Sequence, residues 1–433
     1  MTRLSRVILL LTGLLASAVQ AETILIKGGK VHTLAAAGSL PTADILLRDG
    51  RVEAVAPSID ADADKVIDAT GKVVTPGVIA PMSELGLVEI SAASSTNDYG
   101  VTGKSIGSAF DPLPAYNPNS TLIPYSRAGG VTRAVVFPAI STWNTDAEEM
   151  QRVFAGRSFA IALNGEFDSV VATDLAHKAY LGDAGAQLAG GSRANAFAKI
   201  KRALMEAREY RANREAIRSG NWRQLNYSIA DLEALQKVIQ GQQPLLVTAN
   251  RASDILQALK LARDFNLRLI IAGAAEGWMV APQLAAAGVP VVIDSLDNLP
   301  IAFESLGARA ENAALMQAAG VTLAIAGPGY GGTHNIHLSR QAAGNAVAYG
   351  LPYEEGLKAI SRNVADIYGL EGGTIEPGAV ADVVVWSGDP LEVTSFAERV
   401  LIGGEEQSLV NRSTRLRDRY LKPEAGHGAG YKF

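Results

Sequence analysis

The stretch from Pro244 to Ile325 decides the fold, because four short apolar runs in it alternate with longer stretches of helical spacing. The runs are Pro244-Leu-Leu-Val-Thr248, Leu267-Arg-Leu-Ile-Ile-Ala272, Pro290-Val-Val-Ile-Asp294 and Val321-Thr-Leu-Ala-Ile325. Strands that alternate with helices predict right-handed βαβ units and a parallel sheet. The runs are apolar throughout, which is typical of strands covered on both faces.

The same alternation extends over most of the chain. Two further runs, Thr132–Phe137 and Phe159–Leu163, precede the first four, so the pattern covers about residues 78–370. A closed barrel of ~250 residues fits this span better than two separate domains. We therefore expect an α/β fold with a (β/α)8 TIM-type barrel over residues 77–370. Its insertions are a polar loop at 90–127 and a charged helical segment at 193–240.

Both ends of the chain have a different pattern. Residues 22–76 read as short strands, and Asp49-Gly50 is a strong signal for a two-residue hairpin. The strand pattern returns after residue 370, for example in Ala381–Trp386. We expect residues 22–76 and 371–410 to form one discontinuous β-sandwich domain, followed by a basic tail at 411–433.

The first 21 residues have the features of a secretory signal peptide. Two arginines precede an apolar run of twelve residues, and Val19-Gln-Ala21 supplies small residues for a cleavage site. The run is too short to span a membrane. We expect a periplasmic or secreted protein with no membrane partner after cleavage.

Composition excludes several classes of function. The 433 residues include no cysteine and five histidines, so disulfides, thiolate metal sites and cysteine nucleophiles are excluded. A net charge of −5 argues against a nucleic-acid partner. A small-molecule ligand or substrate is the partner we expect.

Two terminal motifs resemble those of a known family. Gly71-Lys-Val-Val-Thr-Pro-Gly-Val-Ile79 resembles the entry to the first barrel strand of the amidohydrolase superfamily, and Gly372-Gly-Thr-Ile-Glu-Pro-Gly-Ala-Val-Ala-Asp-Val-Val-Val-Trp386 resembles its C-terminal segment. The chain looks like an imidazolonepropionase-like member. The resemblance implies a barrel beside a composite β-sandwich and hydrolysis of non-peptide C–N bonds. It also implies one or two divalent metals, commonly zinc, held by a His-x-His pair, two later histidines, an aspartate and often a lysine or glutamate.

The chain departs from this pattern at the expected ligand positions. Met82 and Glu84 stand where the first two histidines are expected, Asn250 and Gly273 replace the later ones, and Pro328 replaces the aspartate. A thioether is a poor ligand for a hard or borderline divalent ion. We therefore predict no cofactor and doubt a metal-dependent mechanism.

Seven polar residues are candidates for a rebuilt site at the mouth of the barrel. They are Glu84, Asn164, Glu166, Asn250, Glu276, His334 and His337. The two histidines have a spacing that can place both on one helix face, with Glu84 as the nearest acid. Capping or lining of the helix after the last strand is the alternative role for them.

Two hypotheses remain open on function. The first is a hydrolase of the amidohydrolase family with a rebuilt site. The alternative is a catalytically inactive amidohydrolase-fold binding protein or partner subunit in the periplasm. A homo-oligomer and a pairing with a related amidohydrolase are the two assemblies that we consider.

Overall fold

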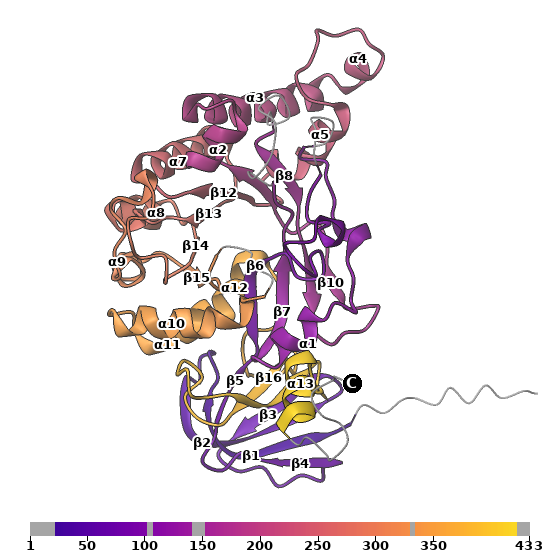
Figure 1. Cartoon of the computed structure of the whole chain (residues 1–433), viewed down its shortest axis with the longest axis vertical. Coiled ribbons are helices and arrows are strands. Elements are labelled where there is room, and N and C mark those ends of the chain that lie inside the picture. The colour runs from indigo at the N-terminus through magenta and orange to yellow at the C-terminus, as the bar shows by residue number, and fades with distance from the viewer. Residues whose placement is uncertain (1–21, 102–106, 141–151, 330–333, 422–433) are drawn as a thin grey trace, which may run out of the picture.

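The computed structural model describes residues 22–101, 107–140, 152–329 and 334–421 (Figure 1). The proposed signal peptide and the end of the basic tail lie outside the described residues. A β-rich domain forms one end of the molecule, and an α/β domain with helices around its strands forms the rest. No helix in the described part is long and apolar enough to cross a membrane.

Strands from both ends of the chain build the β-rich domain. β16 pairs antiparallel with β5, which brings the C-terminal strands onto the N-terminal sheet. The branched side chains of Ile24, Ile45 and Val383 fill its core. The strands are β1 (Ile24–His32), β2 (Ser39–Arg48), β3 (Arg51–Ala56), β4 (Lys65–Asp68), β5 (Val73–Pro76), β16 (Val383–Trp386), β17 (Ala397–Ile402) and β18 (Glu405–Glu406).

Parallel strands form the wall of the second domain, as the apolar runs predict. β6 pairs parallel with β7, β11 to β15 pair parallel in chain order, and β15 lies against β6. Apolar side chains such as Ile79, Leu246 and Val292 fill the interior. The strands are β6 (Val78–Ser83), β7 (Val131–Val136), β11 (His177–Tyr180), β12 (Leu245–Ala249), β13 (Leu269–Gly273), β14 (Val291–Ile293) and β15 (Leu323–Ile325).

One strand of the wall runs against the others. β8 (Phe154–Arg157) and β9 (Phe159–Ala162) form a nearly continuous run. β8 pairs antiparallel with β11, and β9 pairs antiparallel with β7. The barrel fold is confirmed, but this run is not the parallel strand that a regular (β/α)8 pattern requires. Its end therefore points away from the carboxyl ends of its neighbours. β10 (Val170–Ala172) follows as a short antiparallel strand beside β9.

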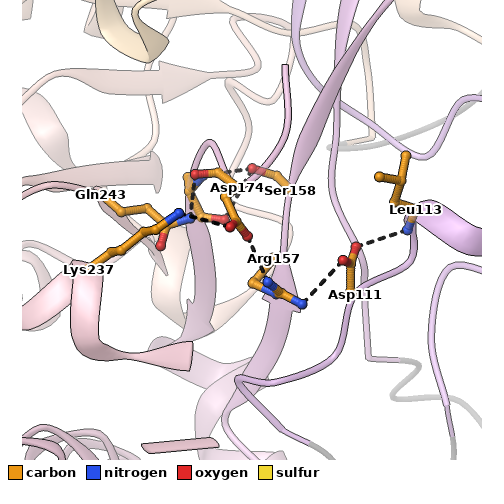
Figure 2. Close-up of polar contacts among 8 residues, drawn as sticks. Asp111, Leu113, Arg157, Ser158, Asp174, Lys237 and Gln243 are labelled. Carbon is orange, nitrogen blue, oxygen red and sulfur yellow. Dashed lines mark hydrogen bonds and ion pairs between the residues drawn. The ribbon is translucent and has the colours of Figure 1, made fainter. Parts of the chain in front are cut away.

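A network of charged side chains fixes the middle of this antiparallel run (Figure 2). Arg157 donates to Asp174 over 2.9 Å and to Asp111 over 3.2 Å. The ammonium of Lys237 lies 3.0 Å from Asp174, and Gln243 donates to the carbonyl oxygen of Asp174. Asp174 and Gln243 precede β11 and β12, so the network lies at the amino ends of the parallel strands.

Helices surround the barrel and close one end of it. Ser361 and Asn363 bond to the carbonyl oxygens of Gly77 and Leu323, which holds α12 across the amino ends of the strands. Residues 193–240 form packed helices, α3 to α6. The helices are α1 (Leu122–Arg127), α2 (Gly182–Leu188), α3 (Arg193–Ala212), α4 (Arg214–Arg218), α5 (Ile229–Ala234), α6 (Gln236–Ile239), α7 (Ala252–Phe265), α8 (Ala281–Ala286), α9 (Asn312–Ala318), α10 (Ser339–Ala348), α11 (Tyr353–Ala359), α12 (Arg362–Tyr368) and α13 (Arg412–Leu421).

Candidate functional site

A cavity of about 240 Å³ lies at the carboxyl ends of the parallel strands. Successive side chains of a strand point to opposite faces, so residues two apart enter the same space. Met82 and Glu84, Lys178 and Tyr180, and Thr248 and Asn250 supply three such pairs, from β6, β11 and β12 and the residues just after them. The other lining residues are Ala139, Leu181, Ala184, Ala249, Ala272, Gly273 and Glu304.

Glu84 directly follows the end of β6 and lines the cavity. Burial disfavours its charged form and raises its pKa to about 7, while the positive charge of Lys178 opposes that rise. A carboxyl group with a pKa near 7 can both accept and donate a proton at neutral pH. Glu84 therefore has the properties of a proton-transfer group.

Lys178 enters the cavity from β11. Its residue is 5% exposed, and its ammonium lies 5.3 Å from the centre of the Tyr180 ring. The hydroxyl of Tyr180 accepts a hydrogen bond from the backbone N–H of Ile140, which holds the ring in place. The cavity thus contains one lysine ammonium beside a carboxyl group of raised pKa.

Asn250 and Glu304 close another side of the cavity. Asn250 Nδ2 donates to Glu304 Oε1 over 2.8 Å, and the backbone N–H of Asp183 donates to Glu304 Oε2 over 2.6 Å. Asn250 Oδ1 stays buried and has no hydrogen-bond partner in the described part of the chain. The same is true of Thr248 Oγ1. Both atoms therefore belong to residues of the cavity wall and have hydrogen-bonding capacity that no described residue uses.

The fold and the matching segments connect this chain to known proteins. The model of the Amidohydrolase family matches residues 337–406. The amidohydrolase from Thermotoga maritima MSB8 superposes with a TM-score of 0.77 at 25% identity, over 90% of this chain and 100% of that one. The chain belongs to the amidohydrolase superfamily. This membership confirms the resemblance carried by the two terminal motifs.

Other amidohydrolase relatives match over shorter segments or at lower identity. The imidazolonepropionase of Acidiphilium cryptum is 38% identical over 90 residues, which is 20% of this chain and 22% of that protein. The dihydroorotase of Listeria monocytogenes is 43% identical over 54 residues, 12% of each chain. These matches span less than a quarter of either relative. A prolidase complexed with N-methylphosphonate-L-proline shares the fold, with a TM-score of 0.52 at 17% identity over 90% of this chain and all of that one.

Three of the candidate residues lie at this end of the amidohydrolase barrel. Glu84 and Asn250 line the cavity. Glu276 follows β13 at the same end of the barrel, but its two oxygens accept the backbone N–H groups of Ala252 and Gly307. Glu276 therefore holds α7 and the loop after β14 in place instead of facing the cavity.

The prediction that Asn164 and Glu166 face the mouth is wrong. They follow β9, which runs antiparallel to β7, so they lie at the opposite end of the barrel. There Asn164 Oδ1 accepts the N–H of Glu166, and the carbonyl oxygen of Asn164 accepts from Arg127. Both residues belong to the turn between β9 and β10.

The two histidines do not line the cavity either. His337 lies in a short 3-10 helix (Ile336–Leu338), and its ring packs edge-on against Tyr125 of α1 at 5.0 Å. Burial lowers the pKa of His337. His334 is exposed. Neither histidine is among the residues that line the cavity with Glu84, and His337 lies directly before α10, the helix after the last barrel strand.

The positions expected to hold metal ligands have little space for a larger side chain and few atoms that could bind a metal ion. A Cβ atom on Gly273 would lie 2.4 Å from Asn250 Oδ1, and the residue has a φ of +105°. Glu84 stands beside the thioether of Met82, and Pro328 supplies no ligand atom. Among the described residues, no group of three or more His, Asp or Glu side chains is close enough to hold a metal ion.

The sequence does not identify two residues of the cavity, Lys178 and Glu304. Lys178 lies on β11, a strand of only four residues, and the segment around His177 reads from the sequence as loop and helix. A Lys-x-Tyr alternation before the helical stretch at 182–188 is the signal that could have found it. Glu304 comes from the loop after β14, and no strand periodicity marks it.

Proposed function

We propose that this chain is a hydrolase that cleaves a C–N bond of a small molecule in the cavity at the barrel mouth. Membership of the amidohydrolase superfamily supports the reaction class, and the location supports the site, because barrel enzymes place their chemistry at the carboxyl ends of the strands. The observation that carries the proposal is the cavity that contains Glu84, whose pKa is raised to about 7, and Lys178.

The donor set at the mouth does not fit the divalent metal centre that the superfamily implies. Zinc prefers imidazole, thiolate and carboxylate ligands, and here two carboxyl groups of raised pKa stand with a thioether, an amide and an ammonium. We therefore derive no step through a metal. The replaced ligands are part of the proposal.

The chemistry is then carried by the residues of the cavity. Glu84 takes a proton from the water that attacks the carbonyl carbon, and it returns that proton to the nitrogen as the C–N bond breaks. The hydroxyl of Thr248 lacks a partner in the described part and can donate to the oxygen that becomes negative. Asn250 Oδ1, oriented by Glu304, can accept an N–H of the scissile amide.

A panel of lactams, acyl amides and esters tests this proposal. Wild type should turn over at least one member, and Glu84→Gln should lose at least ~100-fold in kcat, since general acid–base catalysis contributes ~10²–10⁴. Glu166→Gln, at the opposite end of the barrel, is the matched control and should keep full activity. No turnover of any member, or full activity in Glu84→Gln, would contradict the proposal.

The second candidate is a binding protein that uses the same cavity without catalysis. The absence of a fitting metal-ligand set in the described part favours it. It predicts that a small molecule raises the melting temperature without being converted. In both cases we propose an exported protein that acts on a small molecule, with neither nucleic acid nor membrane as a partner. An assembly with a second copy or a related amidohydrolase remains a prediction.

A further inference from the structure

Lys178 is a buried cation for which the described residues provide no partner. Lys178 is 5% exposed and lines the cavity. No hydrogen bond or ion pair joins its ammonium to a described residue. The ammonium lies over the Tyr180 ring, 5.3 Å from its centre, and its charge also acts on Glu84. A buried charge is costly unless an opposite charge and hydrogen bonds compensate it.

Two other buried cations in the described part of the chain donate hydrogen bonds to oxygen acceptors. Arg133 donates to the carboxylate of Asp382 over 2.6 Å, and Arg340 donates to the backbone carbonyl oxygens of Pro390, Glu392 and Ser395. Lys178 differs from them because the space beside its ammonium is a cavity. A bound molecule is therefore the group that can supply the missing negative charge.

The carboxyl groups of the cavity do not take this place. Neither Glu84 nor Glu304 lies within the 4.0 Å of an ion pair with Lys178, and both oxygens of Glu304 already accept hydrogen bonds. Burial also raises the pKa of both groups. A carboxylate brought in by a ligand would therefore supply the ion-pair partner that no described residue provides for Lys178.

A second polar atom of the cavity wall, Asn250 Oδ1, indicates which other group the ligand carries. Asn250 Oδ1 is buried, lacks a partner in the described part and is fixed as an acceptor by the bond from Nδ2 to Glu304. It therefore suits an N–H donor. The cavity of about 240 Å³ is smaller than the ~300–1,000 Å³ typical of drug-sized sites, so the ligand is small.

We propose that the substrate is a small amide that carries a carboxylate, and that Lys178 holds this carboxylate while Asn250 Oδ1 accepts the amide N–H. This inference rests on the proposed function for the position of the scissile amide. It adds the substrate class: N-acylated amino acids and related amido acids instead of neutral amides. Lys178 is then the residue that determines specificity for an acid.

Binding of a matched pair of probes tests the inference. The probes are N-acetylglycine and the neutral N-acetylglycinamide, measured by calorimetry on the full chain. Wild type should bind the acid at least 10-fold more tightly than the amide, and the preference should shrink as salt is raised, because screening weakens charge pairing. Equal binding of the two probes, tighter binding of the neutral one, or binding of neither would overturn the inference.

Variants separate charge from structure. Lys178→Met should abolish the preference for the acid and Lys178→Arg should retain part of it. Lys237→Met, which removes an ammonium at the opposite end of the barrel, should leave the preference unchanged. A preference that persists in a folded Lys178→Met protein would overturn the inference. If Lys178→Met fails to fold, the wild-type comparison of the two probes and the Lys178→Arg result still decide.

The binding test is independent of turnover. Selective binding of the acid without conversion of any amido acid would support this inference and contradict the proposed hydrolase. Turnover of neutral amides with no preference for an acid would support the hydrolase and contradict this inference.

Discussion

Asn250 and Glu304 are joined by a hydrogen bond of 2.8 Å that runs from the end of β12 to the loop after β14. The other oxygen of Glu304 accepts the backbone N–H of Asp183, at the start of α2. One carboxylate thus connects three segments around the cavity. A Cβ atom on Gly182 would lie 2.5 Å from this carboxylate, so the contact is close.

Removal of this carboxylate should loosen the cavity wall. Glu304→Ala leaves Asn250 and the N–H of Asp183 without their acceptor, and we expect a loss of about 1–3 kcal/mol in the free energy of unfolding. Hydrogen exchange should rise in residues 295–311 and 182–188. Glu311→Ala, an exposed residue of the same loop region, is the control and should change neither. Unchanged exchange in Glu304→Ala would contradict this role.

The ion pair between the two domains should be important for stability. Arg133 of β7 and Asp382, just before β16, are both buried, and their side chains are 2.6 Å apart. Breaking a buried pair by removing one partner typically costs about 3–5 kcal/mol, because the other charge stays buried and unpaired. Arg133→Ala should show this loss in urea unfolding. The exposed pair of Arg48 and Glu53 provides the control, since Glu53→Ala should cost at most about 1 kcal/mol.

Gly273 should tolerate no side chain. Its φ is +105°, and a Cβ atom there would lie 2.4 Å from Asn250 Oδ1. Gly273→Ala should therefore destabilise the protein more than Gly38→Ala, whose φ of +66° is also unfavourable but whose Cβ would meet nothing within 4 Å. We expect a difference of about 1–3 kcal/mol, in line with the cost of overpacking. Equal losses of stability for Gly273→Ala and Gly38→Ala in thermal unfolding would contradict this prediction, because they would show that the cavity wall can move to accommodate a Cβ atom.

The raised pKa of Glu84 predicts how stability depends on pH. The ordinary value is 4.5 and the value in the folded protein is about 7, so the folded state holds the proton more tightly than the unfolded state. Stability is therefore lost as the pH rises from 4.5 to 7, by about 3 kcal/mol. Glu84→Gln should match wild type near pH 4.5 and exceed it by about this amount near pH 8. Met82→Leu, in the same cavity but without a proton to lose, should show a difference from wild type that is independent of pH.

The same pKa predicts the pH dependence of turnover. Glu84 must be ionised to accept the proton of water, so activity should fall as the pH drops through about 7. The charge of Lys178 lowers the pKa of Glu84, so Lys178→Met should move the midpoint of the activity profile to higher pH. A profile with no transition between pH 5 and 9 would show that Glu84 does not carry the proton.

The sequence predicts the parallel strands well because each is an apolar run followed by a periodic helix. It does not reveal the direction of the run from Phe154 to Ala162, since apolar residues alternate in the same way in either direction. For that reason Asn164 and Glu166 lie at the end of the barrel opposite to the one that the sequence predicts. The lysine of the cavity stays hidden because β11 has only four residues, His177–Tyr180, between irregular segments.

Only some of the residues that line the cavity can be predicted from the sequence. Glu84 and Asn250 follow strands whose ends the sequence marks clearly, and both line the cavity. Glu304 comes from a loop, and its position depends on bonds to Asn250 and Asp183 that no local pattern encodes. Contacts between segments far apart in the chain are what the sequence could not provide.

We propose that the barrel mouth hydrolyses its substrate without the usual metal centre. The most direct test is kcat/KM on an amido acid, measured for protein treated with a chelator and for the same protein after addition of zinc, with metal content determined by elemental analysis. We predict well under one equivalent of metal per chain and a kcat/KM that neither treatment changes. An activity that disappears with the chelator and returns with one equivalent of zinc would contradict the claim.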